Sequence, residues 1–409
     1  MSAPLPTGWT EEPLTVVCDV IAGQSPPGST YNEDGVGLPF FQGKAEFGEL
    51  YPAPVKWCSA PTKIAQPGDV LLSVRAPVGP TNLCREPSAI GRGLAALRPH
   101  EGVPAKYLLY AMRASESALR FKSTGTTFEA VSSRDIRGHR VLVAPPELRP
   151  LVVERLEVQL TRIDAAEAAL ARARGNLRRY RTALVNAAVT EGSSGLALDP
   201  STGVDRPPIE WSWVTVGELA SEVRYGTSAK CSDDPTGVPV LRMGNIVNGR
   251  LSLTRLKYLP KGHVEFPDLL LRSGDLLFNR TNSPELVGKA AVFRGTPSAC
   301  SFASYLIRVR LDPVLLPDWL AFVLSSSLGR RWVADVVSQQ VGQANVNGTK
   351  LKNFRVPVPP LEQQVRLVAE VDRRLSVVDD LARQVEENVR RTSNLRAAVL
   401  RDAFAGRLV

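Results

Sequence analysis

Cysteine and histidine, which most often supply nucleophiles and metal ligands, are few and scattered in this sequence. Its 409 residues contain five cysteines and three histidines. No C-x-x-C pair occurs, so neither a disulfide framework nor a zinc site is predicted. We expect reduced thiols and surface or packing histidines, and no metal. The residues concerned are Cys18, Cys58, Cys84, Cys231, Cys300, His100, His139 and His263.

The motifs that assemble common catalytic sites are also missing. There is no G-x-x-x-x-G-K-[ST] loop for a nucleotide phosphate and no H-E-x-x-H or G-x-S-x-G segment. The Pro-Pro pairs at 145–146, 207–208 and 359–360 are followed by Glu147, Ile209 and Leu361, unlike the Asn/Asp-Pro-Pro-Tyr/Phe segment of amino-methyltransferases. No lysine has an acidic residue two positions before it, as a common nuclease signature requires. The sequence therefore predicts a binding protein with no catalytic residues.

Basic and amide side chains near glycines offer a different chemistry. The net charge is +9 and the pI is about 9.5, which permits a nucleic-acid partner but also suits a solvated surface. Arginine pairs with guanine and Asn or Gln with adenine in the major groove, while Lys and Ser/Thr mostly contact phosphate. The alternative for each residue is a solvated turn. The DNA-binding candidates are Gln42, Lys44, Arg75, Arg92, Lys122, Thr124, Lys230, Arg242, Asn245, Arg280, Asn282, Ser283, Lys289, Gln343 and Asn345.

An internal repeat decides the organisation that must position these residues. The segment 136–146 recurs at 351–360, and one offset of 215 places Pro145 on Pro360 and Glu147 on Glu362. The same offset carries residues 160–164 onto 375–379 without a gap. The chain is therefore predicted to contain two copies of one unit.

Each copy ends in a long heptad pattern that favours a coiled coil. Both patterns begin after a Pro-Pro pair, and Ala166, Ala173, Tyr180 and Ala187 form a predicted companion row in the first. Two unrelated surface helices are the alternative interpretation. The helix–helix seam is predicted to consist of Leu156, Ile163, Leu170, Leu177, Leu184, Val371, Leu375, Val378, Val385, Val389 and Val399.

The remaining sequence favours an α+β fold with two globular recognition domains in tandem. Short apolar runs predict strands at 69–75 and 275–280, and helices are predicted at 106–121 and 319–337. The expected boundaries are a first domain at 1–146, a first long helix at 147–191, a linker at 192–207, a second domain at 208–360 and a second long helix at 361–409.

Neither a membrane span nor a secretory signal is predicted. No run of 18 or more apolar residues occurs, and the first residues lack a basic and then apolar leader. We expect a cytoplasmic protein with no membrane partner.

The duplicated pattern resembles the specificity (S) subunit of type I restriction–modification systems. Residues 351–367, which end Pro-Pro-Leu-Glu-Gln-Gln-Val-Arg-Leu, are similar to that family's junction between domain and helix, and residues 395–408 to its helix end. Residues 241–246, 274–283 and 285–289 resemble one class of its target-recognition domains. The first junction differs from the family's pattern, because residues 144–149 lack the Glu-Gln pair.

The resemblance implies two target-recognition domains that each read one half of a bipartite DNA site. It implies two antiparallel helices with pseudo-twofold symmetry that act as a ruler; helices of 44 residues would be about 65 Å long. It also implies two modification subunits that bind S-adenosylmethionine and methylate adenine, and restriction–translocation subunits that use ATP. This chain would bind no cofactor itself.

Two other functions remain open from the sequence. One is a coiled-coil scaffold that bridges protein partners without touching DNA. The other is a specificity module of a type IIB enzyme or another phage-defence DNA-modification system. The recognised DNA sequence and its spacer length do not follow from the residues.

Overall fold

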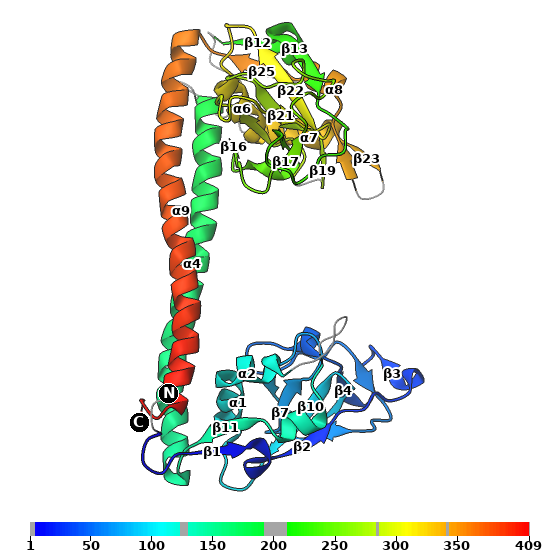
Figure 1. The fold of residues 1–409 in the computed structure, drawn as a ribbon, viewed down its shortest axis with the longest axis vertical. Coiled ribbons are helices and arrows are strands. Elements are labelled where there is room, and N and C mark those ends of the chain that lie inside the picture. The colour runs from blue at the N-terminus through cyan, green and yellow to red at the C-terminus, as the bar shows by residue number, and fades with distance from the viewer. Residues whose placement is uncertain (1–4, 123–129, 192–210, 284–285, 341–342, 409) are drawn as a thin grey trace, which may run out of the picture. The chain divides into compact units, whose positions relative to one another are not determined.

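The computed structural model describes residues 5–122, 130–191, 211–283, 286–340 and 343–408 (Figure 1). It divides into two compact units, Met1–Arg172 with Val385–Val409 and Ala173–Gln384. Each unit joins one α+β domain to parts of both long helices, α4 (Arg149–Glu191) and α9 (Leu361–Phe404). The fold class predicted from the sequence is confirmed: mixed sheets and helices, with a long helix after each domain. The predicted linker at 192–207 and the start of the second domain at 208 lie outside the described residues.

The first unit is built on a four-stranded antiparallel sheet in the order β2-β10-β7-β8. Its strands are β2 (Cys18–Ala22), β10 (Leu94–Pro99), β7 (Val70–Ser73) and β8 (Thr81–Leu83). A second sheet has the order β3-β5-β4-β9-β6, with β3 (Tyr31–Asn32), β5 (Trp57–Cys58), β4 (Leu38–Phe41), β9 (Ser88–Ile90) and β6 (Ile64–Ala65). β1 (Thr10–Pro13) pairs with β11 (Arg140–Val143). The helices are α1 (Ala105–Ala114), α2 (Glu116–Phe121) and α3 (Ser133–Arg137).

The second unit repeats this plan. Its main sheet has the order β13-β22-β18-β20, with β13 (Ala220–Tyr225), β22 (Leu306–Leu311), β18 (Leu276–Asn279) and β20 (Ala290–Val292). A sheet of β17 (Lys257–Leu259), β14 (Val238–Leu241) and β21 (Ser301–Phe302) replaces the five-stranded one, and β12 (Ser212–Thr215) pairs with β25 (Arg355–Val358). Two further small sheets are β15 (Ile246–Val247) with β16 (Arg250–Leu251), and β19 (Thr281–Asn282), β24 (Gln343–Asn345) and β23 (Ser338–Gln340). The helices are α5 (Val216–Leu219), α6 (Pro317–Ser325), α7 (Ser327–Val336) and α8 (Gly348–Lys352).

The same turn and ion pair occur at the start of a central strand in both main sheets. Gly68 (φ +89°) and Gly274 (φ +93°) adopt a left-handed conformation that favours glycine, and each precedes a buried aspartate. Asp69 accepts a hydrogen bond from Arg98 at 2.8 Å, and Asp275 accepts one from Arg310 at 2.8 Å. The predicted strands at 69–75 and 275–280 therefore contain β7 and β18, and the duplication extends to buried ionic contacts.

The predicted domain helices are each broken by a serine. Ser115 separates α1 from α2, and Ser326 separates α6 from α7. The Ser115 hydroxyl donates to the carbonyl of Ala111, and the Ser326 hydroxyl donates to that of Val323. Such local side-chain bonds compete with helix continuation, which explains why each predicted helical stretch contains two short helices.

At the two junctions between domain and long helix, different side chains donate hydrogen bonds to backbone carbonyls of the domain. Gln364 is fully buried; its amide donates to the carbonyls of Pro359 (2.8 Å) and Val314 (2.9 Å) and accepts from the Leu316 N–H (2.8 Å). In the first unit Arg149, 215 residues earlier, donates to the carbonyls of Ala144 (3.0 Å) and Gly102 (3.1 Å). Because Ala144 and Pro359 differ by the same 215, arginine replaces glutamine at the divergent first junction.

Within each unit the start of one long helix packs on the end of the other. In the first unit Leu156 and Leu160 share a core with Leu400, Ala403 and Phe404. In the second, the core consists of Leu184, Val185, Val371 and Leu375. The two helices are therefore antiparallel in both units.

The same ion pair flanks both of these helix contacts. Arg181 of α4 pairs with Asp379 of α9 in the second unit, and Arg396 of α9 pairs with Asp164 of α4 in the first. Both arginines and both aspartates are related by the offset of 215. Each copy therefore contributes the arginine to one pair and the aspartate to the other.

The burial of the predicted seam varies along its length. Leu156, Ile163, Leu184, Val371, Leu375 and Val378 are buried, whereas Leu170, Leu177, Val385, Val389 and Val399 are half-buried. The predicted companion row of the first helix is wrong at Ala166 and Tyr180, which are exposed. Leu160 is buried instead, because a step of four residues from Leu156 stays on the same helix face.

Candidate nucleic-acid interface

Four of the predicted DNA-binding residues surround one hollow in the first unit. Gln42 and Lys44 follow β4, Arg75 follows β7, and Arg92 lies between β9 and β10. All four are exposed, and together with Ser25 they line a hollow of about 280 Å³. Residues from four separate loops thus form one polar surface.

Backbone contacts and glycines bring these loops together. The Gly91 N–H donates to the Phe41 carbonyl at 2.8 Å, and the Val74 N–H donates to the Gly93 carbonyl at 2.9 Å. A Cβ atom at Gly93 would lie 2.1 Å from the Gln42 carbonyl oxygen, so the close approach requires glycine. The Gly91-Arg92-Gly93 segment therefore presents Arg92 from a tightly fixed turn.

The hollow carries positive charge that the protein leaves available. Lys44, Arg75 and Arg92 form no ion pair with any carboxylate in the part of the chain that the structure describes. The Arg92 backbone N–H and Nε both approach the Ser25 hydroxyl, at 3.3 and 3.4 Å. Three cations and the Gln42 amide can therefore meet an anionic or hydrogen-bonding ligand. Lys122 is exposed at the end of α2, and Thr124 lies outside the described residues.

In the second unit the candidates gather around the small sheet of β19, β24 and β23. Asn282 pairs with Ala344 and Thr281 with Asn345, and Gln343 begins β24. The Thr281 hydroxyl donates to the Asn345 amide oxygen at 3.2 Å. Asn345 and Ser283 are half-buried. Strand pairing thus brings together residues that are about 60 positions apart in the sequence.

Arg280 is held beside this sheet by an aromatic ring. Its guanidinium lies 4.9 Å from the centroid of the Tyr225 ring, within the range of a cation–π contact, and Nη1 donates to the Ser304 carbonyl at 3.4 Å. The Tyr225 hydroxyl in turn accepts a hydrogen bond from the Gly348 N–H at 2.6 Å. Arg280 is therefore preorganised and half-buried.

The two groups occupy the same position in the duplicated fold. Arg75 follows β7 and forms an isolated antiparallel β-bridge with Ala130, while Thr281 follows β18 and pairs with Asn345 in an antiparallel sheet. The offset is 206 for Arg75 and Thr281 and 215 for Ala130 and Asn345, which match the offsets of the strands and of the later helices. Each domain therefore presents a set of polar candidates at the end of its central strand.

The structure separates the other candidates from these two groups. Asn245 is buried: its amide donates to the carbonyls of Ser252 (2.8 Å) and Thr254 (3.0 Å) and accepts from the Arg242 N–H (2.9 Å). Its amide is fully used in supporting its own loop, which removes it from the candidate surface. Arg242 is half-buried and donates to the Arg255 carbonyl at 3.0 Å.

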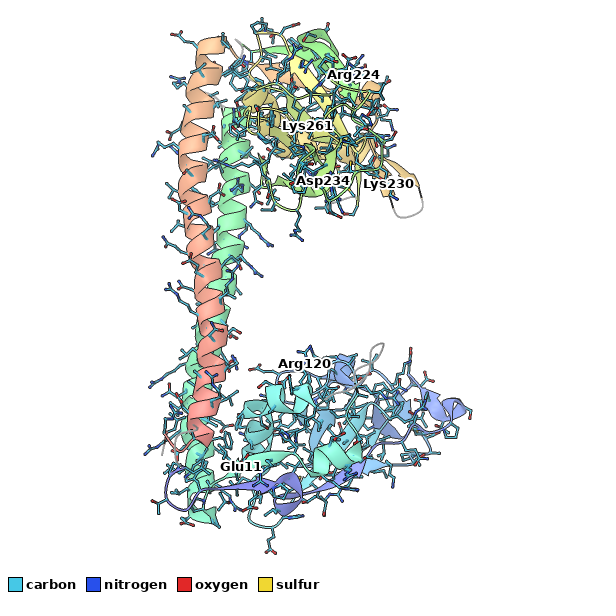
Figure 2. The ribbon with its side chains drawn as sticks, in the orientation of Figure 1. Glu11, Arg120, Arg224, Lys230, Asp234 and Lys261 are labelled. Atoms are coloured by element: carbon cyan, nitrogen blue, oxygen red, sulfur yellow. The ribbon has the colours of Figure 1, made fainter. Side chains whose placement is uncertain are left out.

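Two lysine candidates lie elsewhere in the second unit. Lys230 is exposed in the loop after β13 (Figure 2). Lys289 lines a separate pocket beside the long helices. Neither residue belongs to the group around β19.

Sequence reasoning did not single out Ser25 and Tyr225, which belong to the two groups. A signal was present, because Gly23-Gln24-Ser25 and Gly226-Thr227-Ser228 stand at equivalent positions after β2 and β13. A Cβ atom at Gly23 or Gly226 would come within 2.3 or 2.2 Å of a neighbouring carbonyl oxygen. The repeated G-x-S therefore marks a tight strand exit next to each group.

Two negative observations apply to the described residues. No helix among them is both long enough and apolar enough to cross a bilayer. They also contain no group of three or more His, Cys, Asp or Glu side chains placed to hold a metal ion.

Comparison with protein families and solved structures identifies the fold. The family model for the type I restriction modification DNA specificity domain matches residues 208–389. A chain from a solved structure of a type I restriction–modification system is 21% identical with a TM-score of 0.77, and covers 99% of this chain and 100% of its own. The HsdS subunit from Thermoanaerobacter tengcongensis is 22% identical with a TM-score of 0.53, over 99% and 98%.

Curated relatives agree with these matches. The putative type I restriction enzyme MjaX specificity subunit of Methanocaldococcus jannaschii is 38% identical over 139 residues, which cover 34% of this chain and 33% of that protein. The EcoKI specificity subunit of Escherichia coli strain K12 is 23% identical over 423 residues, which cover 99% of this chain and 90% of that protein. With its duplicated domains and paired helices, this chain is similar over nearly its whole length to the specificity (HsdS) subunits of type I restriction–modification systems.

Proposed function

We propose that this chain is the sequence-specific DNA-recognition subunit of a type I restriction–modification complex, in which each domain reads one half of a bipartite site. The observation that carries the proposal is the equivalent placement of two polar groups, one after β7 and one after β18. Two readers at equivalent positions suit a DNA site with two parts.

The first group contains the side chains that such reading needs. Arg75, Arg92 and Gln42 can form the bidentate hydrogen bonds that identify guanine and adenine, and Lys44 suits a phosphate. Arg280, Asn282, Gln343 and Asn345 are the corresponding set in the second domain. The two sets differ in composition, which would give the half-sites different sequences.

Partner subunits would supply the chemistry. We assign S-adenosylmethionine and adenine methylation to two modification subunits, and ATP-driven translocation and cleavage to restriction subunits. This chain would bind neither cofactor and catalyse neither reaction. The long helices and adjoining domain surfaces would recruit these partners.

A coiled-coil scaffold that never touches DNA is the less favoured function. Such a scaffold has no need for Lys44, Arg75 and Arg92 to gather without ion-pairing carboxylates in the described residues. Service to a type IIB enzyme would use the same recognition surfaces, and the neighbouring genes distinguish that case.

Methylome sequencing tests the proposal directly. The chain is expressed with its modification subunits, and the methylated adenine motif is compared between wild type, a deletion strain and an Arg75→Ala/Arg92→Ala double variant. We expect the double variant to relax or lose one half of the motif and to leave the other unchanged. An unchanged motif, or no methylation that depends on this chain, would contradict the proposal.

A further inference from the structure

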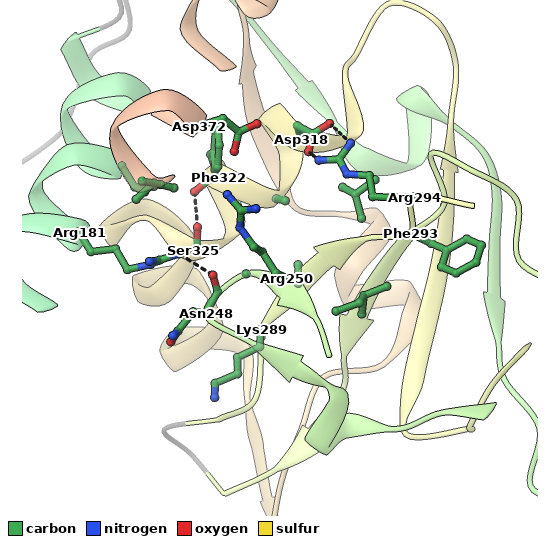
Figure 3. Close-up of a pocket in the computed structure, with 18 of the residues that line it drawn as sticks. Arg181, Asn248, Arg250, Lys289, Phe293, Arg294, Asp318, Phe322, Ser325 and Asp372 are labelled. Carbon is green, nitrogen blue, oxygen red and sulfur yellow. Dashed lines mark hydrogen bonds and ion pairs between the residues drawn. The ribbon is translucent and has the colours of Figure 1, made fainter. Parts of the chain in front are cut away.

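A pocket of about 810 Å³ lies inside the second unit, between the long helices and the domain (Figure 3). Its apolar wall includes Val185, Leu251, Val292, Phe322 and Leu375. Phe322 of α6 also packs on the buried helix cluster that contains Val185 and Leu375. The pocket is therefore part of the contact by which this domain rests on its two helices.

The equivalent place in the first unit is occupied by larger side chains. Helix α1 corresponds to α6 with an offset of 212, which places Leu109 on Ala321 and Arg113 on Ser325. Arg113 reaches from α1 to the carbonyls of Thr81 in β8 (3.2 Å) and Glu49 (2.8 Å). Leucine and arginine in the first unit are thus replaced by alanine and serine in the second, which opens the space.

The charges around this place differ as well. In the first unit Lys106 and Glu157 form an ion pair at 2.5 Å that ties α1 to α4. The corresponding residues are Asp318 and Asp372, which carry like charges and cannot make this bond. Asp318 is instead engaged by Arg294, with one hydrogen bond of 3.0 Å. The direct link between domain and helix is therefore absent at this position of the second unit.

The pocket is cationic overall. Five basic residues, Arg181, Arg250, Lys289, Arg294 and Arg330, line it against the carboxylates of Asp318 and Asp372. Arg181 and Arg250 both pair with Asp379, and Arg294 pairs with Asp318. The Lys289 ammonium forms no hydrogen bond or ion pair within the described part of the chain. An occupant with an apolar side chain and an adjacent carboxylate would complement this lining.

We propose that this pocket receives a segment of a partner protein that inserts a bulky apolar side chain and places a carboxylate near Lys289. The inference rests on the proposed function, because the partner is one of the subunits with which this chain assembles. At the equivalent place in the described part of the first unit, the Arg113 side chain spans from α1 to β8. The contact is therefore made once per chain, and it distinguishes the two halves of the protein.

The lining favours a protein over DNA. An apolar centre with charges of both signs at its rim is typical of protein interfaces, whereas DNA phosphates select exposed basic surfaces. The DNA candidates around β19 form a separate group. A contribution of this pocket to DNA binding is the alternative that the experiment below tests.

The experiment fills the pocket with the residue used by the first unit. Ser325→Arg reproduces Arg113, and Lys289→Glu reverses the charge at the rim without filling the pocket. The full-length chain is titrated with the purified modification subunit and, separately, with the restriction–translocation subunit encoded beside it. We expect both variants to weaken the binding of one of these subunits at least tenfold. Native mass spectrometry of the assembled complex should then show one copy of that subunit fewer than with the wild-type chain. Free-chain affinity for duplex DNA should stay within twofold of wild type.

A matched control is Lys261→Glu, which reverses an exposed charge elsewhere in the same unit (Figure 2). Thermal unfolding of every variant checks that the fold is retained. If Ser325→Arg unfolds the chain, the result for Lys289→Glu alone tests the inference. Wild-type affinity of both subunits for the folded variants would overturn the inference, and so would lost DNA binding with intact assembly. Failure of the wild-type chain to bind either subunit would contradict the proposed function itself.

Discussion

Replacing Gln364 with alanine should loosen the junction between the second domain and α9. The side chain makes three hydrogen bonds of 2.8–2.9 Å from a fully buried position. At about 1 kcal/mol for each bond, the expected loss is about 3 kcal/mol, and about 2 kcal/mol if water reaches one of the released carbonyls. Because 1.4 kcal/mol corresponds to a factor of ten, the local opening equilibrium should rise roughly 30- to 150-fold.

Hydrogen exchange with mass spectrometry measures this change in the intact chain. Exchange of the Leu316 N–H and of the peptides around 314–320 should accelerate by that factor, while peptides of the first unit keep their wild-type rates. Two controls bracket the result. Glu362→Ala removes an exposed neighbour and should change exchange less than threefold, and Arg149→Ala should act on peptides around Gly102 and Ala144 in the first unit. If Gln364→Ala behaves like Glu362→Ala, the role assigned to the buried amide is wrong.

Three further predictions concern stability, assembly and specificity. Burial, reinforced by Lys122, lowers the pKa of His139 from 6.5 to about 4, so the unfolded chain binds the proton more tightly than the folded chain. The contribution of neutral His139 to the free energy of unfolding is therefore complete above pH 6.5 and is lost toward pH 4, at about 1.4 kcal/mol per pH unit. Urea unfolding at pH 7 and pH 4.5 should show a smaller loss of stability for His139→Gln than for the wild type. Leu170→Asp with Val385→Asp places carboxylates on the helix seam and should cost several kcal/mol, so gel filtration should show lost assembly with the modification subunits; retained assembly would refute the seam. Exchanging residues 1–146 for those of a relative should change one half of the methylated motif, and the loss of both halves in a folded complex would refute independent recognition.

The duplicated architecture was predictable because the repeat is clearest where the chain is most constrained. The offset of 215 holds from α3 and β11 into the long helices, where an insertion would shift the helical register. Earlier in the chain the offset varies, from 202 at Trp9 and Trp211 to 206 at Asp69 and Asp275, because loops tolerate insertions. The buried ends Leu400, Ala403 and Phe404 were not assigned to the seam, since the heptad row alone selected Val399.

The candidate interface could be predicted only residue by residue. Proximity to glycine selected Arg92 and Asn245 alike, but only the structure shows that Arg92 is exposed and that Asn245 is buried in its own loop. The gathering of Gln42, Lys44, Arg75 and Arg92 depends on strand pairing between distant segments, which a local pattern does not contain. Tyr225 likewise meets Arg280 through the fold, across 55 positions of sequence.

The reciprocal ion pairs of the long helices make each half of the chain complementary to itself. A half-length chain of residues 1–191 carries Arg181, the arginine of one pair, and Asp164, the aspartate of the other. Two such chains whose long helices pair in the same antiparallel way would form both ion pairs and bury Leu156 and Leu160 against Val185 and its neighbours. The present protein therefore holds, within one chain, the helix contacts of a twofold pair of like subunits. Because its two copies are not identical, each can carry recognition residues of its own, and the second can hold a pocket whose equivalent place in the first is spanned by Arg113.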